Sequence, residues 1–176
     1  MIRLLTLFFF LSLIISKNYC QGSDLSLAEL IAFNDDKLAK AKEFIDADTS
    51  TARIFLNEIS LDLPEISDSL FQVYTNKKLD FFYNYFSEDD LLKELMRSIE
   101  LAKERNDSIS LAQFHNELAE VFLNVSNFKE ALKSTLISLA IYDAQGNQDK
   151  VGELLLKKGA IEYAIGDYVN SIETVF

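Results

Sequence analysis

Very few residues in this chain could act as nucleophiles, proton carriers or soft-metal ligands. The sequence contains one histidine, His115, and one cysteine, Cys20. A single histidine does not build a multi-histidine metal site, and a single cysteine does not form an internal disulfide. A Cys–His or Ser–His catalytic pair would have to rest on His115 alone. We therefore expect a protein that is not an enzyme, with no catalytic residues, no metal site and no cofactor.

The acidic residues are numerous enough for some of them to fall at suggestive spacings. Glu88, Asp89 and Asp90 stand at the start of a predicted helix, where negative charge interacts favourably with the helix dipole. The pair Asp35-Asp36 lacks the glycine-containing loop and ligand spacing of an EF-hand, which favours a solvated helix face over a calcium site. An enzyme that uses paired carboxylates is the remaining catalytic hypothesis.

The composition favours helices. The 176 residues include one proline and five glycines, and 49% of the residues are hydrophobic. Turns consume glycine and proline, and an all-β domain needs one roughly every ten residues. We therefore expect one all-α domain. The formal net charge of −11 repels nucleic acid, so we expect no nucleic-acid partner.

Residues 1–22 are predicted to form a secretory signal peptide. Arg3 supplies a short basic region, and an apolar run follows at residues 4–15. The run is shorter than the roughly 20 residues of a membrane span, and the triplet Cys20-Gln21-Gly22 favours cleavage after Gly22. The predicted location is exported, either periplasmic or secreted. The alternative is a protein anchored in a membrane by residues 4–15.

From residue 87 onward the chain has the pattern of successive amphipathic helices. Apolar residues recur at spacings of three and four between short polar breaks. The breaks at Ser87, Asn127 and Asp167 are evenly spaced, and Asn106 and Gly146 are separated by the same interval. We call this interval the repeat spacing. Two helices in each repeat of about 40 residues are typical of a helical-hairpin solenoid, in which neighbouring units bury each other's apolar faces.

Local signals predict where some helices begin. Ser87 and Asn127 are each followed three residues later by an acidic side chain, which is the spacing of a capping box. Residues 23–86 are less regular, and we expect irregular N-terminal helices or a degenerate repeat there, with one helix starting at Pro64. His115 lies on an apolar stripe, which predicts a hydrogen-bonded and partly buried packing residue.

Several segments of the second half carry a leucine, a small residue and an aromatic residue in a first helix, then a short turn and an alanine in a second. They read LAEVF at 118–122, NFKEAL at 127–132 and GAIEYAIGDY at 159–168. These segments resemble the tetratricopeptide repeat (TPR) family. The ending SLAIY at 138–142 is similar to the long-linker variant of the repeat, which is frequent in exported bacterial signalling proteins. The resemblance covers residues 87–176 as TPR-like hairpins, the last of them truncated.

The sequence departs from the family pattern at a few positions. Ser126 stands at a turn where the family has a glycine, and Leu79 stands where a small residue is usual. Glu162 occupies the usual aromatic position, with Tyr163 one residue later. This order predicts that the helix is rotated by one residue.

The resemblance also implies a binding surface, because the first helix of each TPR hairpin lines a concave groove. The ligand-binding residues that it implies here are Gln113, Asn116, Glu120, Leu123, Asn124 and Tyr163. Amide side chains can hydrogen-bond an extended peptide, and Leu123 and Tyr163 could hold an apolar side chain. Some relatives use basic residues to clamp a peptide carboxylate, whereas Glu117 and Glu120 are acidic. The resemblance therefore disfavours a ligand that presents a C-terminal carboxylate, and the expected partner is a basic or neutral protein or peptide and not an acidic one. The alternative interpretation is an ordinary solvated surface.

Two functional hypotheses follow. The first is a non-enzymatic, exported module that binds a protein or peptide. The alternative is the periplasmic sensory portion of a membrane signalling protein, such as a histidine kinase or a transcription regulator, truncated before its membrane span. A membrane is expected to be involved only if the N-terminal segment is uncleaved or the chain is a fragment of a membrane protein.

Overall fold

The structure is a computed structural model that describes residues 26–61 and 66–175. The predicted signal peptide at 1–22 and the predicted helix start at Pro64 lie outside these residues. Every regular element within them is an α-helix, which confirms the all-α class. Over the same ranges, none of the helices combines the length and the apolar composition needed to cross a membrane.

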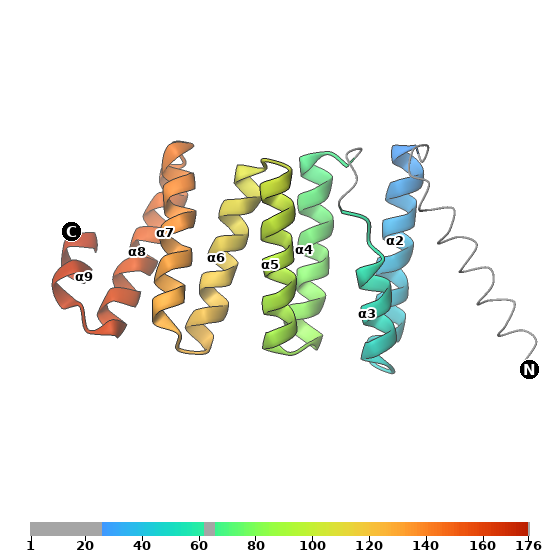
Figure 1. Cartoon of the computed structure of the whole chain (residues 1–176), viewed down its shortest axis with the longest axis horizontal. Coiled ribbons are helices and arrows are strands. Elements are labelled where there is room, and N and C mark those ends of the chain that lie inside the picture. The colour runs from blue at the N-terminus through green and yellow to red at the C-terminus, as the bar shows by residue number, and fades with distance from the viewer. Residues whose placement is uncertain (1–25, 62–65, 176) are drawn as a thin grey trace, which may run out of the picture.

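Eight helices follow one another along the described part of the chain. Figure 1 shows them side by side in chain order, from α2 at one end of the array to α9 at the other. The main contacts join helices that are consecutive in the sequence, as expected for a helical repeat array. The helices are α2 (Leu27–Phe44), α3 (Thr49–Asn57), α4 (Asp68–Tyr85), α5 (Glu88–Glu104), α6 (Ser108–Asn124), α7 (Phe128–Ala144), α8 (Gln148–Ile165) and α9 (Tyr168–Val175).

Four of the connections between helices use the same left-handed turn. The backbone φ is 57° at Asn106, 57° at Ser126, 70° at Gly146 and 91° at Gly166. In each turn the next residue donates its N–H to the carbonyl oxygen five residues earlier, at 2.8–3.0 Å. This is the Schellman arrangement, which satisfies carbonyl groups at the end of a helix. The four left-handed residues are evenly spaced, so each step from one to the next is half of the repeat spacing.

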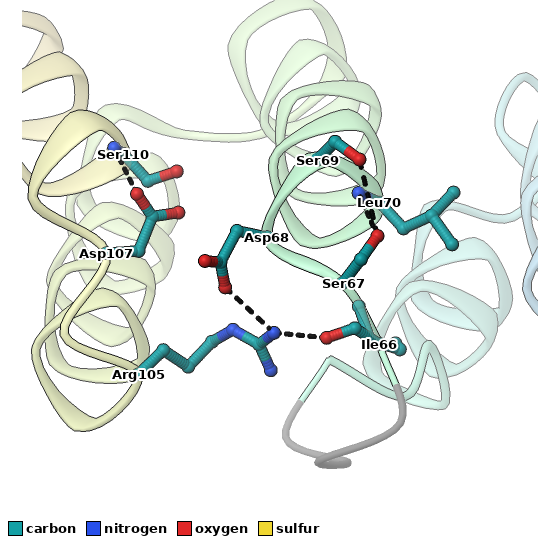
Figure 2. Close-up of polar contacts among 8 residues, drawn as sticks. All are labelled: Ile66, Ser67, Asp68, Ser69, Leu70, Arg105, Asp107 and Ser110. Carbon is teal, nitrogen blue, oxygen red and sulfur yellow. Dashed lines mark hydrogen bonds and ion pairs between the residues drawn. The ribbon is translucent and has the colours of Figure 1, made fainter.

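The residue after each left-handed turn precedes a new helix. Asp107 and Asn147 each accept a hydrogen bond from the backbone N–H three residues later, at 3.0 and 3.2 Å. Figure 2 shows the Asp107 cap. Ser87 caps α5 in the same way at 3.2 Å, as expected. The side chain of Asn127 makes no capping hydrogen bond, so the capping box expected there is wrong.

Helix α4 begins at Asp68, and Arg105 at the end of α5 holds its first turn. The Arg105 guanidinium donates hydrogen bonds to the Asp68 carboxylate at 3.1 Å and to the carbonyl oxygen of Ile66 (Figure 2). Its carbon atom also lies 5.1 Å from the centre of the Phe71 ring, within the range of a cation–π contact. These contacts tie the start of α4 to the turn between α5 and α6.

Side-chain size affects how closely two paired helices approach. In the α6–α7 hairpin, Ala119 and Ala131 are fully buried. One repeat earlier, Leu79 and Leu91 occupy the corresponding positions of α4 and α5. The bulkier side chains keep the backbones apart, and α4 and α5 accordingly make fewer close backbone contacts than α6 and α7.

A buried ion pair joins α4 to α5. The Lys78 ammonium lies 2.7 Å from the Glu94 carboxylate, and the two side chains are only 1% and 8% exposed. Burial lowers the pKa of Lys78, and the negative charge of Glu94 opposes that shift. One repeat later, Leu118 and Ser134 stand at the corresponding positions of α6 and α7. The α6–α7 hairpin therefore does not repeat this ion pair.

Replacing Ser126 by glycine should stabilise the protein. A residue other than glycine costs about 1–2 kcal/mol in the left-handed conformation, and glycine loses up to about 1 kcal/mol in backbone entropy. We expect Ser126→Gly to raise the free energy of unfolding by about 0.5–1 kcal/mol, the difference of these two effects, as measured by urea denaturation followed by circular dichroism.

Ser87→Gly is the matched control for this variant. It should lose a few tenths of a kcal/mol, because Ser87 caps a helix from an extended conformation. A destabilised Ser126→Gly variant would contradict the left-handed turn.

The buried ion pair can be exchanged for the pair found in the next hairpin. Lys78→Leu alone leaves the Glu94 carboxylate buried without its partner, and we expect a loss of about 3–5 kcal/mol in the free energy of unfolding. The double variant Lys78→Leu plus Glu94→Ser copies Leu118 and Ser134 and should recover most of that loss. Urea denaturation of the parent, the two single variants and the double variant measures the coupling. Additive losses would show that the two side chains do not interact.

Candidate binding surface on the first helices of the hairpins

Polar side chains join the first helices of successive hairpins, α2, α4, α6 and α8. Each hydrogen bond reaches a residue about one repeat away in the sequence. The bonds run from Tyr74 to Asp35 at 3.1 Å, from Gln72 to Gln113 at 2.8 Å and from Lys157 to Asn116 at 2.5 Å. We call the surface along these contacts the first-helix face. The repeat spacing of the sequence therefore appears in space as a row of contacts between neighbouring first helices.

Three of the six predicted ligand-binding residues belong to this row. The half-buried Gln113 also donates hydrogen bonds to Asn76 at 3.1 Å and to Glu117 at 2.9 Å. Asn116 accepts its hydrogen bond from Lys157, which also forms an ion pair with the exposed Glu120. These side chains already hold α4, α6 and α8 together. A ligand that used them would have to share or replace these contacts.

The other three predicted residues are not engaged with neighbouring first helices in this way. Leu123 is half-buried on α6, and Asn124 is exposed at the last residue of that helix. Tyr163 on α8 is 65% exposed, and its ring lies edge-on against the Tyr168 ring with the centroids 5.2 Å apart. Leu123 and Tyr163 are one repeat apart, so they occupy equivalent positions of two units.

The expected one-residue rotation of α8 is wrong. Glu162 is buried and Tyr163 is exposed, so Glu162 keeps the place that the half-buried Phe122 occupies one unit earlier. The Glu162 carboxylate lies 2.8 Å from the Lys158 ammonium and accepts a hydrogen bond from the Thr174 hydroxyl at 2.9 Å. These two partners allow a carboxylate to occupy a buried position that is usually aromatic.

A pocket of about 510 Å³ opens between α2 and α4 on the first-helix face. Both helices contribute side chains to its lining. They are Asp35, Leu38, Ala39 and Lys42 on α2, with Lys77, Asp80, Phe81, Asn84 and Tyr85 on α4. Its volume suits a small ligand or one to two side chains of a bound peptide.

The small side chain of Ala39 helps to explain why the pocket is open. Helices α2 and α4 are equally long, and their starts at Leu27 and Asp68 are one residue further apart than the repeat spacing. With that offset Ala39 corresponds to Asp80, which itself corresponds to Glu120 one unit later. In the later unit Glu120 pairs with Lys157. The equivalent lysine of α4 is Lys77, and Ala39 offers it no carboxylate. Lys77 instead lies 3.7 Å from the Asp35 carboxylate and 5.2 Å from the centre of the Tyr74 ring.

Asp80 of α4, which lines this pocket, acts electrostatically on Glu117 of α6. The half-buried Glu117 of α6 has a raised pKa, because burial disfavours its charged form and the negative charge of Asp80 adds to that effect. The hydrogen bond from Gln113 opposes the shift. Asp80 makes no side-chain hydrogen bond and no ion pair with any described residue. The first-helix face therefore carries unneutralised negative charge between α4 and α6.

Of the residues that line the pocket, only Asp35 was singled out from the sequence, as part of a solvated helix face, although the same periodicity reaches α4. Asn76, Asp80 and Asn84 stand one repeat before the predicted Asn116, Glu120 and Asn124. Tyr83, one repeat before Leu123, is 68% exposed. Extending the repeat spacing one unit upstream would have identified α4 as another first helix. Helix α2 is harder to place in this way, because its offset from α4 exceeds the repeat spacing by one residue.

His115 lies among packing residues. It is buried on α6, and the charges that influence it are those of Glu100 and Lys103 on α5 and Lys133 on α7. Its Nδ1 has no hydrogen-bond partner among the described residues, so the expectation of a hydrogen-bonded histidine is wrong for that atom. Burial is the main cause of its lowered pKa. Within the described ranges, no three His, Cys, Asp or Glu side chains come together as a metal site.

No protein-family model and no curated protein matches this chain. Among solved structures, the chain is similar to the crystal structure of BtubC (BKLC) from P. vanneervenii. The TM-score is 0.57 with 14% sequence identity, over 86% of this chain and 73% of that chain. At this identity the similarity concerns the fold alone.

His115 should make the stability of the protein depend on pH. Because its pKa is lowered in the folded state, the unfolded chain binds more protons, so stability falls as the pH drops below about 6.5. His115→Leu removes this proton linkage. We expect the urea midpoint of the variant, relative to the parent, to be higher at pH 5.5 than at pH 7.5. Other titrating groups are common to both proteins and cancel in this difference. An equal difference at both pH values would contradict a depressed histidine pKa.

Proposed function

We propose that this chain is a non-enzymatic, exported TPR-like module that binds another protein or a peptide on its first-helix face. The TPR assignment is supported by the sequence motifs, by the repeat spacing and by consecutive packing of the helices. The export assignment rests on the sequence of residues 1–22 alone. Binding is favoured over catalysis because the chain has a single histidine and a single cysteine.

The observation that carries the proposal is the combination of a pocket with exposed aromatic and amide side chains on one set of helices. The 510 Å³ pocket lies between the first helices α2 and α4. Tyr83, Asn124 and Tyr163 add exposed groups further along α4, α6 and α8. Tyrosine is enriched at protein interfaces because it combines a large apolar ring with a hydrogen-bonding hydroxyl.

The charge of the surface indicates the kind of partner. The chain has a net charge of −11, and Asp80 and Glu117 leave negative charge on the first-helix face. A basic or neutral segment would be attracted to this surface, and an acidic one would be repelled.

A pair of double variants tests the proposed surface. Asn124→Ala plus Tyr163→Ala alters the first-helix face at exposed positions and should keep the helical circular dichroism of the parent. We expect the proteins that the parent captures from extracts of its source, after chemical cross-linking, to be lost or reduced at least tenfold with this variant.

The matched control alters exposed apolar residues on the second helices. Met96→Ala plus Leu136→Ala likewise truncates two exposed side chains, on α5 and α7, and should keep the captured proteins. Mass spectrometry of the captured material compares the three samples. The same partners for the parent and the first double variant would contradict binding on the first-helix face.

A further inference from the structure

The pocket between α2 and α4 has an apolar floor and polar edges. Leu38 and Phe81 are half-buried and pack against the main hydrophobic core. The Tyr85 ring lies beside Phe81, with the centroids 6.1 Å apart, and Tyr85 is half exposed. An apolar side chain placed here would contact Leu38, Phe81 and Tyr85, and the apolar surface removed from water would favour binding.

One end of the pocket is closed by a network that is already satisfied. Tyr74 donates to the Asp35 carboxylate, and Lys77 lies 3.7 Å from the same carboxylate. Burial and this carboxylate raise the pKa of Tyr74 to about 12, so its hydroxyl stays a donor at neutral pH. The charges of Asp35 and Lys77 therefore already balance each other, and a ligand does not have to supply a charge at this end of the pocket.

The edge of the pocket towards α6 does lack a neutralising charge. Asp80 has no hydrogen bond or ion pair through its side chain among the described residues, and the half-buried Glu117 carries a second carboxylate nearby. A cation from a partner would relieve the repulsion between these carboxylates. Lys42 and Asn84 line the pocket as well, and their donors could hydrogen-bond peptide carbonyl oxygens.

Building on the proposed function, we infer that this pocket binds an extended peptide segment in which an apolar side chain and a lysine or arginine are separated by one residue. The apolar side chain occupies the floor formed by Leu38 and Phe81, and the cation contacts Asp80. In an extended peptide, side chains two positions apart point to the same side and lie about 7 Å apart. That spacing allows both groups to reach one pocket and its adjoining edge.

Selection from a phage-displayed library of random heptapeptides tests this specificity, and it does not require the natural partner to be identified. The purified chain is immobilised, and the most enriched peptide is then synthesised with a fluorescent label for polarisation titrations. We expect enrichment of an apolar residue two positions from lysine or arginine. Replacing either residue of that peptide by serine should weaken binding at least tenfold.

Two variants of the protein test the pocket directly. Ala39→Glu supplies the carboxylate that Glu120 supplies one unit later, so it should pair with Lys77, occupy the pocket and preserve the fold. Asp80→Lys reverses the charge at the edge. Each should weaken binding of the selected peptide at least tenfold. Met96→Ala and Asp143→Lys are the matched controls, because they change an exposed apolar residue of α5 and an exposed acid of α7 outside the pocket.

The outcomes separate this inference from the proposed function. If enriched peptides bind the parent and Ala39→Glu equally well, or share no apolar–basic pattern, the pocket specificity is wrong while peptide binding stands. If the library yields no peptide that binds the folded chain, both the specificity and the peptide-binding function are contradicted. Loss of binding with Ala39→Glu and Asp80→Lys, together with unchanged binding by the controls, supports the inference.

Discussion

In the turns at Asn106, Ser126, Gly146 and Gly166, two backbone hydrogen bonds close over the end of one helix, and the next helix begins almost at once. This constraint fixes the length of the half-repeat and allows helices of 17 or 18 residues from α5 to α8. Nearly equal helices joined by equal turns place residues one repeat apart at equivalent positions. The hydrogen bonds between first helices join residues about one repeat apart, and they depend on that regular spacing.

The candidate site lies where this regularity weakens. The connection between α4 and α5 contains Phe86 in an extended conformation instead of a left-handed residue, and α3 has only nine residues. The offset between α2 and α4 is one residue longer than the repeat spacing, and at Ala39 α2 lacks the carboxylate that would complete the contact with Lys77. The pocket opens where α2 has the small Ala39 at the position that Asp80 and Glu120 occupy on α4 and α6.

The sequence predicted the helices from residue 87 onward well, because short polar breaks interrupt strong apolar periodicity there. It failed where the outcome depended on side-chain partners. Asn127 has backbone angles similar to those of Asp107 and Asn147 but makes no cap, since side-chain orientation is not set by the local pattern. Glu162 can be buried because its carboxylate pairs with Lys158 and accepts a hydrogen bond from Thr174. The local sequence pattern around Glu162 does not predict these partners. The pocket was missed because the spacing changes between α2 and α4.

Different pairings between first and second helices also distinguish the repeats from one another. Residues at equivalent positions of the repeat differ in each hairpin. Lys78 and Glu94 form an ion pair between α4 and α5, and Leu118 and Ser134 are buried in the α6–α7 hairpin. In the α8–α9 hairpin, Lys158 donates a hydrogen bond to Thr174. If α4 packed against α7 in place of α5, Lys78 would face Ser134 and Glu94 would lose its cation. A buried charge without its partner costs about 3–5 kcal/mol. Compared with an apolar pair, the ion pair therefore adds little to the free energy of unfolding. It does raise the free energy of a misfolded arrangement in which one of these helices of nearly equal length packs one repeat out of place.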